Sequence, residues 1–373
     1  MKNTILILTT IILNNFFPTL LMFIFFIFDS NIIGVEIALL TSALNLICQI
    51  FSMHGRNTIL TSKVDNFEVL VFERINLSIF FGISAILLIY LINYNLNINT
   101  ISFIPIILLF WINEIFISVF EKKKQLRPIW VTNILILTYF LSTFLLIYLD
   151  TYQFLLKSNF IFSCIFTINL FLSLKKFLIF KNTNFFTTIQ FNLKSVSSFF
   201  LIFPVFIWRI FIYETFEVDE AALYFMCFAI ASLPGTLFLN VIGISLFNLR
   251  LTYFFKAIVY VIISFILLNI LFKDVSLQFI SQIFIKINEY KFFITLIYSL
   301  MGSILLIFGI FDRCKKFIKF ENKSRIFKVD ILNSMVISTL VPLIIFFDSE
   351  LIHISFLLSG LISFISYKLI LNE

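Results

Sequence analysis

Histidine and cysteine are scarce in this chain of 373 residues, which has two histidines and four cysteines. The histidines stand far apart in sequence, and the cysteines form neither a CxxC pair nor another metal-binding spacing. The sequence therefore supports no disulfide framework and no zinc site, and it predicts no cofactor.

Charge is scarce as well, since 13% of the residues are charged, 61% are hydrophobic and the mean hydropathy is +1.08. This composition excludes an ordinary soluble protein and predicts an all-α, polytopic membrane protein. The net charge of +7 does not indicate a nucleic-acid partner, because the basic residues fall between apolar segments, where they report membrane orientation.

Long loops are also missing. The longest predicted cytoplasmic loops, roughly 54–74, 175–195 and 312–330, have about twenty residues each, which is too short for a separate soluble domain. The last two alternate Phe with Lys, so they are either amphipathic helices on the inner leaflet or solvated charged loops. None carries recognisable enzyme chemistry, and we expect no catalytic residue.

Twelve apolar segments are long enough to cross about 30 Å of hydrocarbon as helices. The first lacks a small-residue cleavage site and is too long for a signal-peptide core, so we expect it to remain as a span. The segments are Ile5–Phe28, Ile32–Met53, Ile75–Asn93, Thr100–Phe120, Ile129–Leu149, Gln153–Leu174, Val196–Tyr213, Ala221–Phe247, Leu251–Phe272, Phe292–Phe311, Ile331–Phe347 and Leu351–Leu371.

Basic residues alternate between the loops that this assignment creates. Twenty-two of the 27 lysines and arginines, with Arg74 and Arg313 among them, fall on one side, and four fall on the other. Arg209 alone remains inside a segment. Under the positive-inside rule, this asymmetry predicts that both termini are cytoplasmic.

A weak internal repeat appears when the chain is shifted by 184 residues, which brings Glu36 onto Glu220. Pro18 and Pro204 then lie at nearly corresponding places in the first and seventh segments. Interrupted helices at matching places in two halves indicate a transport site, so we expect these prolines to act as hinges. The repeat predicts two six-helix lobes, residues 1–180 and 181–373.

Ionisable side chains inside a membrane segment are functional candidates by default. Arg209 is either such a candidate or a side chain that extends to the nearer interface. Glu114 is either a proton or cation site or a protonated acid bonded to a neighbouring helix. Glu214 lies close enough in sequence to pair with Arg209, and it is a second candidate for ion or proton coupling.

Polar side chains gather on the first two segments of each half. Thr41, Asn45 and Gln49 share one helix face, which should turn away from lipid. A cavity with a cation and several amides suits a substrate that carries phosphate or sugar, because arginine offers a fixed fork of donors to phosphate oxygens. The predicted substrate-binding residues are Arg209, Asn14, Asn15, Asn45, Gln49 and Asn240.

The segment WRIFIYETFEVDEAALYFMCFAIASLPG, residues 208–235, resembles the second-half signature of Wzx-type polysaccharide flippases of the MATE-like (MOP) superfamily. Arg209, Glu220 and Tyr224 stand at the spacing of that signature. Trp208 stands where the family usually has an acid before the arginine. Residues 26–59 look like the corresponding hairpin of the first half, with Gly34 at the usual glycine position.

This resemblance implies a MATE-like fold and a transporter that flips polyprenyl-diphosphate-linked oligosaccharide across the bacterial inner membrane by alternating access. Arg209 would meet the diphosphate or an acidic sugar. The implied partners are the lipid-linked substrate, membrane lipids and other membrane proteins of polysaccharide assembly. Two alternatives remain, an exporter of small molecules in the same superfamily and a membrane enzyme of the O-antigen polymerase or ligase type.

Overall fold

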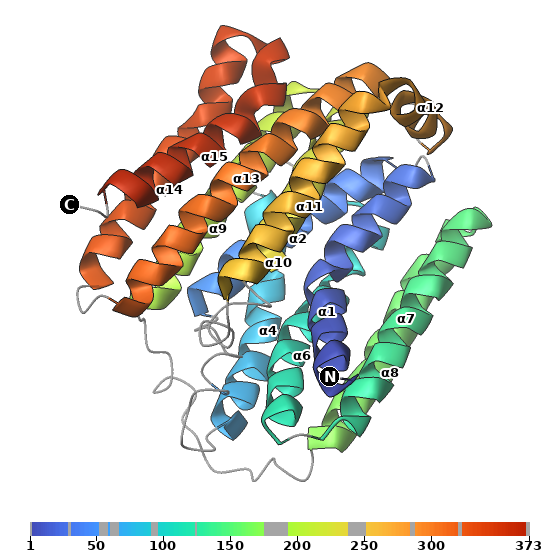
Figure 1. The fold of residues 1–373 in the computed structure, drawn as a ribbon. Helices are drawn as coiled ribbons and strands as arrows, with labels where there is room; N and C mark the ends of the chain where they lie inside the picture. Colours follow the sequence, from blue (N-terminus) through green and yellow to red (C-terminus); the bar gives the residue numbers. More distant parts are fainter. Residues whose placement is uncertain are drawn as a thin grey trace. The chain divides into compact units, whose positions relative to one another are not determined.

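The computed structural model describes ten stretches of the chain, and all regular structure in them is helical. These stretches are residues 2–28, 31–51, 59, 67–90, 96–123, 125–174, 193–237, 251–283, 288–319 and 323–370. They fall into two compact units. Unit 1 is Met1–Phe28 with Glu36–Val196, and unit 2 is Asp29–Val35 with Ser197–Glu373 (Figure 1). The predicted lobe boundary at residues 180 and 181 lies outside the described stretches and stays a prediction.

Unit 1 is built around helix α6 (Ile104–Lys122), which packs against α1, α4 and α8. Its apolar side chains are buried almost all the way round, as expected for a helix at the centre of a bundle. Helices α7 and α8 lie side by side (Figure 1). The other helices are α1 (Lys2–Ile27), α2 (Asn31–Phe51), α4 (Phe67–Tyr90), α5 (Ile98–Ile101), α7 (Arg127–Tyr148) and α8 (Leu155–Leu174). The residues of α2 up to Val35 belong to unit 2.

The fourth predicted span, Thr100–Phe120, is not one continuous helix. The short helix α5 ends at Ile101, two turn residues follow, and α6 begins at Ile104. Pro105 stands in the first turn of α6, where proline is tolerated because its missing N–H has no partner within the helix. The proline therefore favours a new helix start at this point.

Unit 2 is built around α13 (Glu289–Lys319), which packs against α10, α11 and α15. Gly302 of α13 and Gly360 of α15 lie at the closest approach of these two helices, where a Cβ on either glycine would overlap the other helix's backbone. The other helices are α9 (Leu193–Thr215), α10 (Val218–Leu237), α11 (Leu251–Leu271), α12 (Lys273–Ile283), α14 (Lys323–Phe347) and α15 (Ser355–Ile365).

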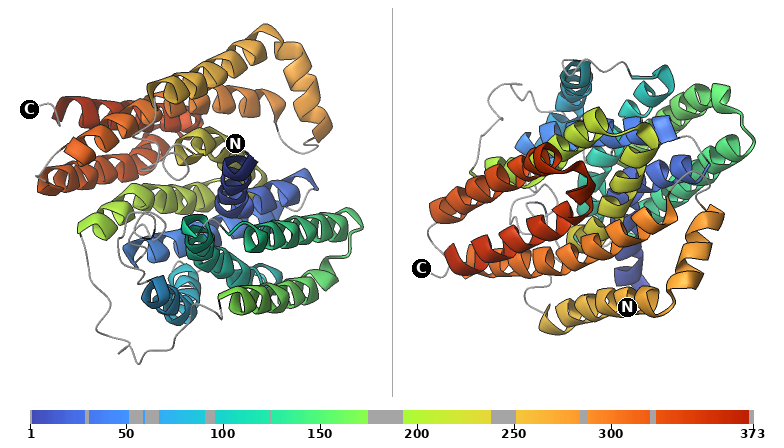
Figure 2. Two further views of the ribbon diagram at one scale, coloured as in Figure 1. Left: turned by 60° about the horizontal axis from the view of Figure 1, so that its bottom comes forward. Right: turned by 90° about the horizontal axis from the view of Figure 1, so that it is seen from above.

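The stretch 312–330, predicted as a cytoplasmic loop with an amphipathic helix as one alternative, is helical for most of its length. Helix α13 continues to Lys319 and α14 begins at Lys323, so the Phe- and Lys-rich residues extend two spanning helices. Residues 175–192, the other Phe- and Lys-rich stretch, lie outside the described residues. In the predicted outer loop 273–291, the structure has the short helix α12, which turns sharply away from α11 (Figure 2).

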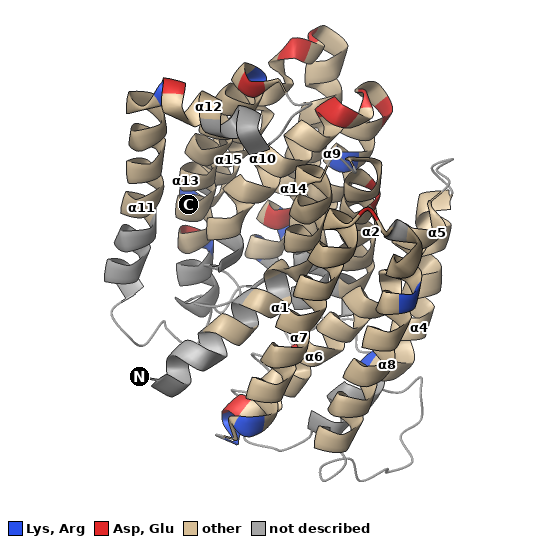
Figure 3. Cartoon of the chain, turned by 90° about the vertical axis from the view of Figure 1, so that its right-hand side faces the viewer, with Lys and Arg blue, Asp and Glu red and all other residues tan. Residues whose placement is uncertain are grey.

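Seven segments of the described chain are long and apolar enough to span a membrane. Charged residues stand mainly near helix ends, with long uncharged stretches between them (Figure 3). This is the pattern of a polytopic, helical membrane protein. The segments are Asn31–Cys48, Ile98–Lys122, Arg127–Tyr148, Leu155–Ser173, Glu289–Arg313, Arg325–Phe347 and Ser349–Lys368.

Candidate functional site

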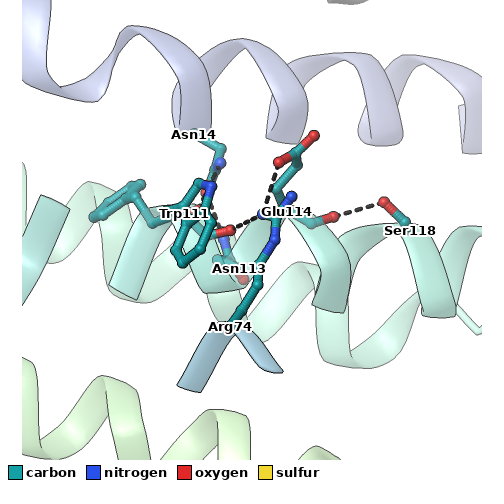
Figure 4. Close-up of polar contacts among 7 residues, drawn as sticks. Asn14, Arg74, Trp111, Asn113, Glu114 and Ser118 are labelled. Atoms are coloured by element: carbon teal, nitrogen blue, oxygen red, sulfur yellow. Dashed lines mark hydrogen bonds and ion pairs between the residues drawn. The ribbon is translucent and has the colours of Figure 1, made fainter. Parts of the chain in front are cut away.

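A charged pair lies inside unit 1, between α4 and α6. Arg74 of α4 is buried, with 4% of its surface exposed, and its Nη1 lies 2.8 Å from Oε2 of Glu114 (Figure 4). The assignment of Arg74 to a loop is therefore wrong, while its side of the membrane stays a prediction. Helix α4 starts at Phe67, so Arg74 stands two turns inside it.

Trp111 of α6 holds the guanidinium from a second side. Nη1 of Arg74 donates a hydrogen bond to the Trp111 carbonyl oxygen, and the guanidinium carbon lies 4.5 Å from the centroid of the indole ring. A cation over an indole face is attracted by the ring quadrupole, and the attraction strengthens away from water. The orientation of Arg74 is thus fixed by Trp111 as well as by Glu114.

The indole N–H of Trp111 is itself a buried donor. Among the described residues, Nε1 has no hydrogen-bond partner. Buried donors without an acceptor are uncommon because each costs about 1–3 kcal/mol. An unsatisfied donor in the ring that contacts a guanidinium marks a place where a hydrogen-bond acceptor would be stabilised.

Two buried asparagines join this cluster to α1. Asn14 donates from Nδ2 to the carbonyl oxygen of Phe110 at 3.0 Å, and it accepts from Nδ2 of Asn113 at 2.7 Å (Figure 4). Among the described residues, the carbonyl oxygen Oδ1 of Asn113 has no partner. We define the polar cluster of unit 1 as Asn14, Arg74, Trp111, Asn113 and Glu114.

The two members of the ion pair differ in their access to the outside of the protein. The side chain of Arg74 is 5% exposed, whereas that of Glu114 is 31% exposed. In a low-dielectric interior, a charge is tolerated only when it is paired, and removal of one partner leaves a costly isolated charge. The cluster therefore offers a rigid, enclosed cation and a more accessible carboxylate, which suits the binding of an anion or of a proton.

Arg209 lies on α9 of unit 2 and is half-buried. Its guanidinium carbon is 5.7 Å from the centroid of the Phe225 ring on α10. The preceding residue, Trp208, is buried and donates from Nε1 to the carbonyl oxygen of Ile337 at 2.9 Å, so it anchors α9 to α14. The side chain of Glu214 on the same helix is exposed, and its pairing with Arg209 stays a prediction.

The remaining predicted site residues are distributed unevenly. Asn45 is exposed on α2, while Thr41, one turn earlier, is buried. Pro18 and Pro204 lie inside α1 and α9, as their hinge role requires, but that role is not tested. The side chains of Asn15 and Gln49 and the whole of Asn240 lie outside the described part of the structure.

Unit 2 contains a second buried ion pair that the sequence reasoning missed. Asp330 of α14 accepts from Nε of Arg313 at 2.9 Å, from Nη2 of Arg313 at 2.7 Å and from the Tyr367 hydroxyl at 2.8 Å. The Asp330 side chain is 0% exposed. Arg313 was assigned to a loop because its helix was predicted to end at Phe311, whereas α13 continues to Lys319. Arg74 was assigned to a loop for the opposite reason, because its helix was predicted to start at Ile75.

One sequence signal would have placed Arg74 correctly. The residues before it, FEVLVFE, are largely apolar and extend the predicted third span toward its N-terminus. A helix that starts at Phe67 puts Arg74 within the apolar run.

No group of three or more His, Cys, Asp and Glu side chains in the described stretches is arranged to hold a metal ion. The chain matches no family model, and the comparisons give no match among curated proteins or solved structures.

Proposed function

We propose that this protein is a flippase that moves polyprenyl-diphosphate-linked oligosaccharide across the bacterial inner membrane. The observation that carries the proposal is the buried pair of Arg74 and Glu114 within an apolar helix bundle. Because a charge in an apolar interior is costly, a buried arginine that lies over an indole ring with an unsatisfied N–H supports a site for a polar, anionic cargo.

The arrangement of helices supports a transporter with twelve spans. Among the described residues, each unit has six long helical segments, when α2 is counted with unit 1 and the 3₁₀ turn before α15 is counted as part of its span. The fourth of these is α6 in unit 1 and α13 in unit 2, and each is the helix around which its unit packs. Such a correspondence is expected of two repeated lobes, the architecture on which alternating access depends.

Arg209 supplies a second cation under this proposal. Its place on α9 within the sequence that resembles the flippase signature suits contact with the diphosphate or with an acidic sugar. Pro18 and Pro204 would allow α1 and α9 to bend as the lobes move. The protein would work in the inner membrane with both termini cytoplasmic, alongside other membrane proteins of polysaccharide assembly.

The proposal is tested by deleting the gene and determining where the lipid-linked oligosaccharide accumulates. We expect complete repeat units on the cytoplasmic leaflet of the deletion strain, and normal export after complementation with the wild-type gene. Complementation with Arg209→Ala at equal protein abundance should fail to restore export. Single units that reach the outer leaflet unpolymerised would refute flipping and indicate a polymerase instead.

A further inference from the structure

The polar cluster of unit 1 combines three features that a purely structural ion pair does not need. The cation is fixed by Trp111 independently of its carboxylate partner, because the carbonyl bond and the ring contact both come from that residue. The carboxylate is the more accessible member, at 31% exposed against 5%. The N–H of the indole ring that the guanidinium covers has no acceptor among the described residues.

The pair of Arg313 and Asp330 in unit 2 provides an internal contrast. Both oxygens of Asp330 are engaged by Arg313, Tyr367 adds a third bond, and the carboxylate has no exposed surface. This arrangement suits a permanent link between helices. Glu114 instead uses a single oxygen, Oε2, in its ion pair with Arg74, and its side chain is 31% exposed.

We propose that Arg74 and Trp111 form a diphosphate-binding site and that Glu114 occupies it as an internal, displaceable anion until the cargo arrives. This inference rests on the proposed flippase and deepens it by naming the part of the cargo that unit 1 recognises. Phosphate oxygens are strong acceptors, so they replace the carboxylate on the guanidinium and also satisfy the indole N–H. The carboxylate keeps the buried arginine neutralised between transport cycles, which avoids an isolated charge in the apolar interior.

The ion pair of Arg74 and Glu114 lowers the affinity of the site for diphosphate. Diphosphate must compete with Glu114 for Arg74, so a more stable internal pair raises the observed dissociation constant for diphosphate. Substitution Glu114→Gln removes the competing charge while preserving the shape of the side chain. An ion pair of intermediate exposure should weaken the binding of diphosphate by about tenfold, and Glu114→Gln should strengthen it by the same factor.

The test uses the purified full chain in nanodiscs and equilibrium binding of radiolabelled inorganic pyrophosphate by scintillation proximity. We expect Glu114→Gln to bind about tenfold more tightly than wild type, and Arg74→Met to bind only at background. Trp111→Phe, which retains a ring but lacks the N–H, should bind several-fold more weakly.

Asp150→Asn is the matched control for the change in net charge. Asp150 is exposed in the turn after α7, and its positive φ of 54° is one that asparagine tolerates. This variant should bind like wild type. Arg74→Met leaves an unpaired carboxylate and Glu114→Gln removes the carboxylate that neutralises a buried guanidinium, so the elution profile of each is compared with that of wild type. The double variant Arg74→Met/Glu114→Leu is measured as well, and it should elute as a monodisperse protein without binding.

Two results would overturn the inference, namely equal affinities of Glu114→Gln and Asp150→Asn, or retained binding in a folded Arg74→Met/Glu114→Leu protein. The source of the diphosphate is resolved by competition. Farnesyl diphosphate should displace the label at lower concentration than unlabelled pyrophosphate does, and equal or weaker competition would overturn the assignment to a lipid-linked cargo.

These outcomes are independent of the gene-deletion test. If pyrophosphate binds as expected but deletion leaves the lipid-linked oligosaccharide correctly distributed, the diphosphate site stands and the flippase is refuted. If deletion blocks flipping but Glu114→Gln binds like wild type, the flippase stands and the displaceable carboxylate is refuted.

Discussion

The enclosed pair of Arg313 and Asp330 in unit 2 allows a stability prediction. Substitution Asp330→Asn replaces a carboxylate oxygen that accepts from Arg313 with an amide group that carries donors, while the volume hardly changes. Because the Asp330 side chain is 0% exposed and that of Arg313 is 12% exposed, water cannot compensate fully. We expect the free energy of unfolding to fall by about 3–5 kcal/mol, as when one partner of a buried pair is removed.

The hydrogen bond from Tyr367 contributes less to the free energy of unfolding than the ion pair does, and its contribution can be measured separately. Its hydroxyl donates to Asp330 at 2.8 Å, and a hydrogen bond to a charged group contributes about 1.5–3 kcal/mol. Tyr367→Phe should therefore lower the free energy of unfolding by roughly 1.5 kcal/mol, well below the cost of Asp330→Asn.

The matched control removes the network entirely. The triple variant Arg313→Met/Asp330→Leu/Tyr367→Phe leaves no unpaired charge and should unfold within about 1–2 kcal/mol of wild type. Steric trapping in bicelles measures these free energies. Two results would contradict a dry environment around Asp330. The free energy of unfolding of Asp330→Asn would be within about 1 kcal/mol of the wild-type value, or the triple variant would be as unstable as Asp330→Asn.

Two further predictions concern helix packing and topology. Gly302→Ala should sharply lower the yield of folded protein in detergent chromatography, because its Cβ would overlap the backbone at Phe356. Gly82→Ala is the control and should be tolerated, because its Cβ would lie 3.2 Å from a side-chain atom of Ile104. Equal yields of the two variants would contradict the close contact of α13 and α15. In a variant without the native cysteines, Gln153→Cys should react with an impermeant maleimide on intact cells and Gln125→Cys only after lysis, and the reverse pattern would refute cytoplasmic termini.

Only part of the polar cluster in unit 1 could be predicted. Asn14 and Glu114 stood out because polar and ionisable groups within an apolar run are unusual wherever they occur. Arg74 did not stand out, because the predicted span began one residue after it. Helix boundaries are set by capping and by packing on other helices, so an apolar run locates a span more reliably than its ends.

The amide face predicted on the second span shows a different kind of limit. The spacing of Thr41 and Asn45 places them on one side of α2, yet Thr41 is buried and Asn45 is exposed. Helical periodicity gives the direction in which a side chain points around the helix axis, but its burial depends on which part of the protein lies in that direction. Such neighbours come from distant parts of the chain.

The sequence by itself determined that this protein is helical and membrane-embedded, because long apolar runs can satisfy their backbone polar groups in lipid only as helices. It also supplied the charges and amides within those runs. Only the tertiary structure decided which of them meet: Arg74 with Glu114, forty residues apart, and Asn14 with Asn113, ninety-nine apart. Partnership between groups on different helices depends on how the helices pack, and a buried charge is stable only where that packing brings its partner within reach.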